Sequence, residues 1–269
     1  MTDYDLLATE SGNAVVVAMD HGLALGAAEG FENPGQTLST VLQSDPDGVL
    51  VGPHFARRFR DQLVDADVDV VLTADVVTFS RHPGLNEGET VWTPAFDTEL
   101  LLDLDPAGVK ALLVFGREDP DMYQRNIEYV ASLAEELRGT GVPFVVEPVL
   151  WGPRVPDQFE VDPDLVANAQ RMAWEYGADI LKAPYTGTPD SFSEIVDNSP
   201  VPLMILGGPA SGSTRAMLQD VAEAIEAGAR GVMIGRSIWQ TDDPAAVVSA
   251  MNEIVHEGAS VDAVWDDSS

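Results

Sequence analysis

The chain contains no cysteine and, among its 269 residues, only two lysines, Lys110 and Lys182. Without cysteine it has no disulfide bonds and no thiolate metal ligands, and the sequence gives no indication of redox environment. No apolar run approaches the roughly 20 residues that a membrane-spanning helix needs. The first ten residues, MTDYDLLATE, are acidic and lack the basic and then apolar segments of a secretory signal. We therefore expect a cytoplasmic protein.

Positive charge is scarce as a whole. The chain has 45 Asp and Glu residues against 14 Lys and Arg, which gives a formal net charge of −31. Such a surface repels nucleic-acid phosphates and anionic lipids, so we expect no nucleic-acid or membrane partner. The acidic residues are spread along the chain, a pattern typical of a protein from a high-salt cytoplasm, where ions screen the self-repulsion. An ordinary acidic protein is the alternative.

Short apolar segments rich in β-formers recur along the chain, each followed by a polar turn and a helical stretch. Their nearly continuous hydrophobicity is typical of parallel strands that are covered on both faces. The predicted strands are residues 14–19, 48–52, 69–74, 110–115, 143–148, 178–183, 202–207 and 231–235. Eight such strands with helical returns predict an α/β fold, a single-domain (β/α)8 TIM barrel over residues 1–269. A doubly wound open sheet is the alternative.

Helical segments lie between these strands. Apolar residues spaced by three and four predict helices over residues 122–139, 163–177 and 214–228, and Asp162 precedes the second as a candidate N-cap. The segment 81–109 breaks the rhythm, because Gly, Pro and acidic residues come before the fourth strand. It predicts a loop or hairpin plus a short helix, an irregular insertion that could cover the barrel mouth.

Lys182 lies near the C-terminal end of the predicted sixth strand, on the same face as Ile180. That end is where the βα loops of a barrel gather and where barrel enzymes do their chemistry. The lysine could simply reach water or pair with a carboxylate. It could instead be a desolvated amine whose lowered pKa makes it a nucleophile toward a carbonyl carbon, forming a Schiff base. We favour the second interpretation because the chain has almost no other lysine.

Imine chemistry also needs groups that move protons. Asp20 and His21 end the first predicted strand. The alternative role for Asp20 is simply to cap the next turn. Glu147 ends the fifth strand beside the sixth, where a carboxylate is costly unless it is paired or used. It could flank Lys182 in catalysis or form a plain salt bridge. Tyr185 could donate a phenolic proton. Alternatively, it has no catalytic role and its ring packs against the loop.

Glycine-rich turns end the last two strands, in LGGPASGS (206–213) and IGRSIW (234–239). Glycine lets the backbone approach a ligand and direct N–H groups at it, and these two loops commonly form a phosphate site in barrels. Arg236, a cation in such an acidic protein, strengthens the indication of a phosphate site. The predicted phosphate-binding residues are Gly207, Gly208, Ser211, Gly235 and Arg236.

These segments together resemble the archaeal-type class I fructose-bisphosphate aldolases of the DeoC/LacD aldolase superfamily. The resemblance rests on MDHG at the first strand, GADILKAPYTGTPDSFSEIV (177–196), LGGP and GRSIWQ, in consistent order over almost the full length. It implies a (β/α)8 barrel and a lyase that cleaves or condenses a phosphorylated ketose, as in glycolysis or gluconeogenesis. Lys182 would be the Schiff-base residue and Asp20 a carboxylate that moves protons or orients the imine. The resemblance also implies a ring-like homo-oligomer without metal or cofactor.

The chain departs from this family at two places. Where relatives have a Y-P-R-G-like motif after the fifth strand, this chain reads VVEPVLWGPR, and its Glu147 resembles the acid/base glutamate of class I tagatose-bisphosphate and sulfofructose-phosphate aldolases. Where relatives often read GGPK, the last position is Ala210.

Other functions remain open within the resemblance. They are a 2-amino-3,7-dideoxy-D-threo-hept-6-ulosonate synthase-type transaldolase of aromatic amino-acid biosynthesis, an acyl-transfer relative and a non-catalytic sugar-phosphate-binding barrel. Scattered histidines predict no metal site: His21, His54, His82 and His256 form no pair at ligand spacing.

The charge of −31 predicts a salt-dependent fold. Lowering the KCl concentration from molar to about 0.1 M, where the Debye length grows from about 3 to 10 Å, should lower the Tm because carboxylates then repel one another. Differential scanning calorimetry over a KCl series measures this. A Tm that does not depend on salt would contradict the high-salt interpretation.

Overall fold

Eight parallel strands close into a barrel in the computed structural model, which describes residues 6, 8–78, 91–155, 159–207 and 212–266. The order around the ring is β1-β10-β9-β8-β7-β6-β3-β2. The strands are β1 (Ala14–Ala18), β2 (Gly48–Val51), β3 (Asp69–Thr73), β6 (Gly108–Phe115), β7 (Phe144–Leu150), β8 (Ile180–Pro184), β9 (Leu203–Leu206) and β10 (Gly231–Ile234). The predicted TIM barrel is confirmed, and the open-sheet alternative is wrong because β1 pairs with both β2 and β10.

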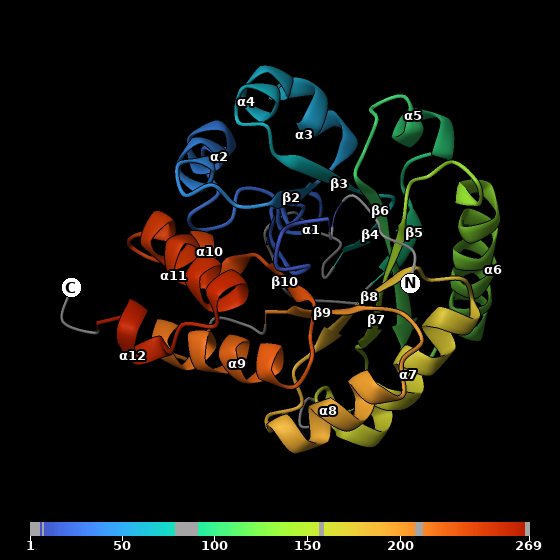
Figure 1. Cartoon of the computed structure of the whole chain (residues 1–269). Coiled ribbons are helices and arrows are strands. Elements are labelled where there is room, and N and C mark those ends of the chain that lie inside the picture. The colour runs from blue at the N-terminus through green and yellow to red at the C-terminus, as the bar shows by residue number, and fades with distance from the viewer. Residues whose placement is uncertain (1–5, 7, 79–90, 156–158, 208–211, 267–269) are drawn as a thin grey trace.

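Helices surround the barrel (Figure 1). They are α1 (Gly22–Leu25), α2 (Pro34–Leu42), α3 (Pro53–Arg58), α4 (Arg60–Asp65), α5 (Thr98–Leu102), α6 (Pro120–Leu137), α7 (Pro163–Glu175), α8 (Pro189–Asp197), α9 (Thr214–Glu226), α10 (Arg236–Trp239), α11 (Pro244–Glu257) and α12 (Val261–Val264). The three predicted helices correspond to α6, α7 and α9. Within the described ranges, none of these helices is long and apolar enough to cross a membrane.

Acidic residues begin several of these helices. Asp162 caps α7 as predicted, because its side chain accepts a hydrogen bond from the Leu165 N–H, and Asp97 and Asp243 cap α5 and α11 in the same way. A carboxylate at a helix N-terminus satisfies an unpaired N–H and interacts favourably with the helix dipole. Part of the large acidic complement therefore supports the outer ring of helices.

Hydrophobic side chains form two layers because successive residues of a strand point to opposite faces. Inside the barrel, one cluster includes Val16 of β1, Val145 of β7, Ile180 of β8 and Met204 of β9. The outward side chains of the same strands pack against the helices in a larger cluster. The inward positions nearer the C-terminal strand ends are not apolar, and the candidate site lies there.

The segment after β3 forms an antiparallel hairpin of β4 (Asp75–Thr78) and β5 (Val91–Pro94), followed by α5. The short helix α5 lies within the segment 81–109 as predicted, whereas β4 precedes that segment, and residues 81–90 lie outside the described residues. The next strand, β6, begins at Gly108 instead of the predicted residue 110. Lys110 therefore lies within a strand and not at its start.

Among the described residues, β6 has no strand partner on the β3 side beyond Lys110, since the β3–β6 pairing ends at Thr73 and Lys110. Side chains take over its hydrogen bonds. Asn126 of α6, fully buried, accepts from the Val114 N–H at 2.7 Å and donates to the Leu112 carbonyl at 2.8 Å. One amide thus completes the edge of a strand that carries part of the site.

Replacing Asn126 with leucine should lower the free energy of unfolding by about 3 kcal/mol, because it leaves a buried N–H and a buried carbonyl without partners. Urea unfolding at fixed KCl concentration measures the change. Gln124→Leu is the matched control: it lies on the exposed face of the same helix, and its effect should stay within about 0.5 kcal/mol. Equal urea midpoints for the two variants would contradict the edge role of Asn126.

Candidate active site

Both lysines of the chain lie inside the barrel and contact one carboxylate oxygen. Lys182 Nζ is 2.9 Å from Oε2 of Glu147, and Lys110 Nζ is 3.1 Å from the same oxygen. Lys182 and Glu147 are each 6% exposed and Lys110 is 4% exposed. Burying three charged groups is costly unless they are paired. The lysine pair around Glu147 therefore defines the candidate site.

The alternation of side chains along each strand explains how these groups meet. Val145 and Ile180 pack in the barrel interior, so Glu147 and Lys182, two residues further along β7 and β8, also point inward. Val145 pairs with Ile180 in the strand register, which places Glu147 beside Lys182. On the other side of β7, Lys110 lies opposite Val145 and its long side chain reaches Glu147.

The two lysines control the charge of the carboxylate. Burial by itself would raise the pKa of Glu147, but Lys110 and Lys182 outweigh it and lower the pKa to about 2. Burial would likewise lower the pKa of Lys110, yet Glu147 and Asp20 raise it above its ordinary value. Glu147 is therefore an anion and Lys110 a cation at neutral pH.

Asp20 and His21 extend the cluster from the end of β1. Asp20 Oδ2 is 3.5 Å from Lys110 Nζ, and Asp20 Oδ1 is 3.6 Å from His21 Nδ1. Burial raises the pKa of Asp20, but Lys110 and then His21 outweigh it, so the pKa lies below its ordinary value. Burial lowers the pKa of His21. The neutral imidazole packs edge-on against Trp239, whose indole N–H donates to the Ala18 carbonyl.

Asp75, at the start of β4, is a third carboxylate beside this cluster, and it is buried, with 2% of its surface exposed. Its Oδ2 accepts hydrogen bonds from the Trp92 indole at 2.7 Å and from the Leu112 N–H at 2.9 Å. Its Oδ1 is buried and has no hydrogen-bond partner within the described part of the chain. Burial raises the pKa of Asp75 to about 6, although Lys110 opposes this. Asp75 thus anchors the β4–β5 hairpin to β6.

The sequence analysis did not identify Lys110 or Asp75 as site residues. A signal existed for both. Lys110 stands in the apolar run GVKALLVF, and Asp75 stands between the apolar runs VVLTA and VV, so each is a charged residue where a strand is expected. Lys110 contacts Glu147 and Asp75 lines the same small cavity, and both placements depend on the strand order β3-β6-β7, which the sequence does not state.

Two adjoining cavities open at this end of the barrel. The smaller, of about 90 Å³, is lined by Asp20, Lys110, Glu147 and Lys182 among others. The larger, of about 650 Å³, extends over the ends of β7 to β10. His21, Ala24 and Trp151 line both cavities, so the lysine cluster borders a space large enough for a small metabolite.

The predicted phosphate-binding residues lie partly in the larger cavity. Gly207 and Arg236 line it. Gly235 backs onto the Ala18 carbonyl and the His21 ring, where a Cβ atom would collide with both. Only glycine allows this close approach, which fixes the start of α10 beside His21. Gly208 and Ser211 lie outside the described residues.

Tyr185 lines the larger cavity, but its hydroxyl is directed elsewhere. It donates to Oε2 of Glu223 on α9 at 2.6 Å, and its ring packs edge-on against Phe192. Burial and the Glu223 carboxylate raise the pKa of Tyr185. The structure therefore brings together Lys182, Glu147, Asp20 and His21 of the predicted catalytic set, and it places the Tyr185 hydroxyl at Glu223.

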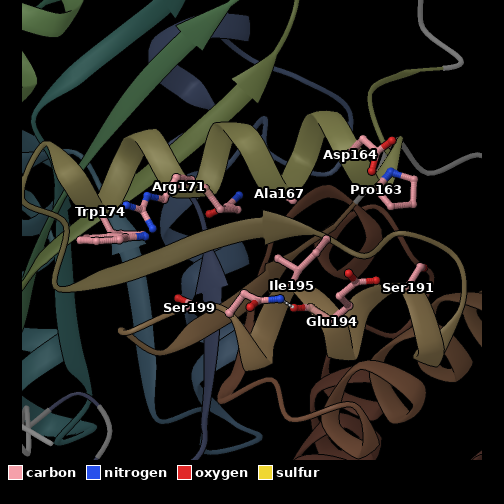
Figure 2. Close-up of a pocket in the computed structure, with 11 residues that line it drawn as sticks. Pro163, Asp164, Ala167, Arg171, Trp174, Ser191, Glu194, Ile195 and Ser199 are labelled. Carbon is pink, nitrogen blue, oxygen red and sulfur yellow. Dashed lines mark hydrogen bonds between the residues drawn. The ribbon is translucent and has the colours of Figure 1, made fainter.

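A separate hollow of about 230 Å³ lies on the outside of the barrel between α7 and α8 (Figure 2). Its walls include Trp174, with the Arg171 guanidinium 4.4 Å from the ring centroid, and Glu194 and Ile195 from α8. None of the predicted site residues lines this hollow, so it is not part of the candidate active site.

Comparison with known proteins agrees with this geometry. The family described as DeoC/LacD family aldolase matches residues 14–241. An uncharacterized aldolase of Saccharolobus solfataricus is 30% identical over 253 residues, which cover 94% of this chain and 93% of the relative. A 2-amino-3,7-dideoxy-D-threo-hept-6-ulosonate synthase of Halobacterium salinarum is 31% identical over 254 residues, which cover 93% of this chain and 89% of that protein.

A solved structure is similar over nearly the whole chain. It is an archaeal fructose-1,6-bisphosphate aldolase with its catalytic lysine covalently bound to the carbinolamine intermediate of the substrate. The two folds match with a TM-score of 0.80 at 27% sequence identity, covering 93% of this chain and 96% of that chain.

The raised pKa of Asp75 predicts a pH-dependent stability. In the unfolded chain the carboxyl ionises near 3.8 and in the folded protein near 6, so stability should fall as pH rises through this window. Asp75→Asn retains an oxygen that accepts from Trp92 and Leu112 but has no charge to bury. Its stability relative to the wild type should therefore rise by roughly 3 kcal/mol between about pH 3 and pH 7, and stay nearly constant above. Urea unfolding at each pH measures this, and parallel pH curves would contradict it.

Proposed function

Because this chain belongs to the DeoC/LacD family of aldolases and is a class I aldolase, we propose that it cleaves and condenses a phosphorylated ketose of the fructose 1,6-bisphosphate type, with Lys182 as the Schiff-base residue. The observation that carries this proposal is the 2.9 Å contact between Lys182 Nζ and Glu147 Oε2 inside the barrel. A nucleophilic amine needs a proton acceptor within hydrogen-bond reach, and Glu147 meets this requirement.

Imine formation begins when Lys182 gives a proton to Glu147 and its amine attacks the C2 ketone carbon of the substrate. The product is a carbinolamine. Glu147 then returns the proton to the C2 hydroxyl, which leaves as water and produces an iminium ion. Lys110 remains a cation throughout, because Glu147 and Asp20 raise its pKa, and it holds Glu147 in place.

Cleavage follows from the positive charge on the iminium nitrogen. A base takes the proton of the C4 hydroxyl, the C3–C4 bond breaks, and its electrons move into the iminium to give an enamine. The aldehyde half leaves. Protonation of the enamine carbon and attack of water then release a dihydroxyacetone-phosphate-like ketone and free Lys182. We assign the proton transfers to Glu147. Asp20, 3.5 Å from Lys110, orients that lysine or a substrate hydroxyl.

The phosphate next to the ketone would lie in the larger cavity. Arg236 supplies a guanidinium there, and Gly207 keeps the wall free of a side chain. Gly208, Ser211 and Gly235 complete the proposed phosphate site. His21, which lines both cavities, would lie between the phosphate and the lysine cluster.

The similarity to the synthase of Halobacterium salinarum supports a second candidate function. In that case the lysine-bound fragment would be transferred to a different aldehyde, such as aspartate semialdehyde, rather than released. Parallel assays of fructose 1,6-bisphosphate cleavage and of transfer onto aspartate semialdehyde distinguish the two. A non-catalytic barrel is not favoured, because it would have no use for a buried lysine paired with a proton acceptor. No contact of the described residues favours the acyl-transfer alternative.

Lys182→Met should reduce cleavage of fructose 1,6-bisphosphate by at least about 10³-fold while the protein remains folded, because the nucleophile is lost and Glu147 keeps Lys110 as a partner. Borohydride reduction with dihydroxyacetone phosphate, followed by peptide mass spectrometry, should find an adduct on Lys182 of the wild type and none in the variant. Lys110→Met removes the other buried amine and should still form the adduct. An adduct on Lys110, or unchanged turnover of Lys182→Met, would refute the proposal.

A further inference from the structure

The larger cavity carries a guanidinium at each of two opposite sides of the barrel. Arg236 follows β10, and Arg117 follows β6 by two residues; both line the cavity. In the ring order β10-β9-β8-β7-β6, the two strands are four steps apart in a ring of eight, so they face each other across the barrel. The strand that carries Lys182, β8, lies two steps from each.

Arg117 is held in place by the loop that follows β7. Its Nη1 lies 3.4 Å from the Trp151 carbonyl, a long hydrogen bond. Gly152, at φ +143°, lies so close to Gly116 and to Arg117 Cδ that a Cβ atom there would collide with both. The Arg154 N–H also donates to the Gly116 carbonyl at 3.0 Å. These contacts orient the guanidinium before any ligand binds, which lowers the entropy lost on binding.

Trp151 places this arginine relative to the lysines. It lines both the larger cavity and the small cavity over Lys182, so the carbonyl that holds Arg117 belongs to the residue where the two spaces adjoin. A substrate whose ketone carbon lies at Lys182 can therefore extend in two directions. One direction leads to Arg236 and the other to Arg117.

On the basis of the proposed function, we propose that Arg117 is a specificity-determining residue that binds an anionic group, phosphate or carboxylate, on the aldehyde half of the substrate. The phosphate beside the ketone occupies the Arg236 side. After the C3–C4 bond breaks, the departing half lies on the opposite side, where the planar guanidinium can form two hydrogen bonds to a phosphate or carboxylate.

The net negative charge of the protein makes a cation in the cavity important for binding an anionic substrate. With a formal charge of −31, the surface repels every anionic substrate. Among the described residues, four cationic side chains line the two cavities: Lys110, Lys182, Arg117 and Arg236. The acidic residues that line the larger cavity are Glu160 and Asp220, and those that line the smaller one are Asp20, Asp75 and Glu147. Arg117 and Arg236 are therefore the side chains of the larger cavity that can attract an anionic group of a substrate.

Arg117→Met tests this assignment in the condensation direction, with dihydroxyacetone phosphate as donor. The KM for glyceraldehyde 3-phosphate should rise at least about tenfold, because one charge-assisted contact is lost, while the KM for uncharged glyceraldehyde stays within about twofold. Aspartate semialdehyde as acceptor forms a second arm: an increase for it alone would identify the bound group as a carboxylate. Equal changes for charged and uncharged acceptors would overturn the proposal.

Arg154→Met is the matched control. Arg154 lies on the adjacent loop with an exposed side chain that does not line the cavity, and its backbone contact to Gly116 is unaffected by the substitution. It should leave both KM values unchanged. The borohydride adduct of dihydroxyacetone phosphate on Lys182 should form normally in Arg117→Met, because this donor does not reach Arg117.

Calorimetric binding of unreactive probes keeps this inference separate from the proposed function. Hexane-1,6-diol bisphosphate should bind Arg117→Met at least about tenfold more weakly than the wild type, whereas hexyl phosphate should bind both equally. A wild type that forms no adduct but shows this difference would refute the aldolase proposal and retain the anion site. Equal binding of the bisphosphate to both proteins would refute the anion site whatever the reaction.

Discussion

A single carboxylate oxygen, Oε2 of Glu147, accepts contacts from both lysines of the chain inside the barrel. Each of the three groups would be unstable alone at this depth, since removing one partner of a buried ion pair commonly costs 3–5 kcal/mol. Together they maintain an ionised carboxylate, with a pKa of about 2, beside two amines. The register of β6, β7 and β8 brings these three side chains together.

That arrangement relies on hydrogen bonds from outside the barrel sheet. Beyond Lys110, the backbone of β6 would lack hydrogen-bond partners on the β3 side. Asp75 and Asn126 supply these partners through their side chains. Both bond to the backbone of the strand that carries Lys110. The β4–β5 hairpin therefore has a structural consequence for the site, because it supplies Asp75 and its partner Trp92.

The few cationic residues of the chain are placed differently from its many acidic ones. Aspartates cap several outer helices, where salt can screen them. The two lysines and two of the arginines line the cavities at the C-terminal ends of the barrel strands. Arg117 and Arg236 are the side chains of the larger cavity that would attract an anionic sugar phosphate. This contrast gives selectivity without requiring a basic protein surface.

Much of the fold followed from the sequence by itself, because parallel strands buried on both faces leave continuous apolar runs and helices leave a three-to-four spacing. All eight strands, the N-cap Asp162 and the shared face of Lys182 and Ile180 could be predicted in this way. Glu147 could be paired with Lys182 because sequential strands of a barrel are neighbours. What only the tertiary structure decided are contacts across the ring and between loops. Lys110 reaches Glu147 from the other side of β7, Asp75 arrives through a hairpin, the Tyr185 hydroxyl bonds to Glu223, and Arg117 lies opposite Arg236. Side-chain direction along one strand is a local property with a period of two, whereas the meeting of side chains from different strands depends on register and closure, which no single segment contains.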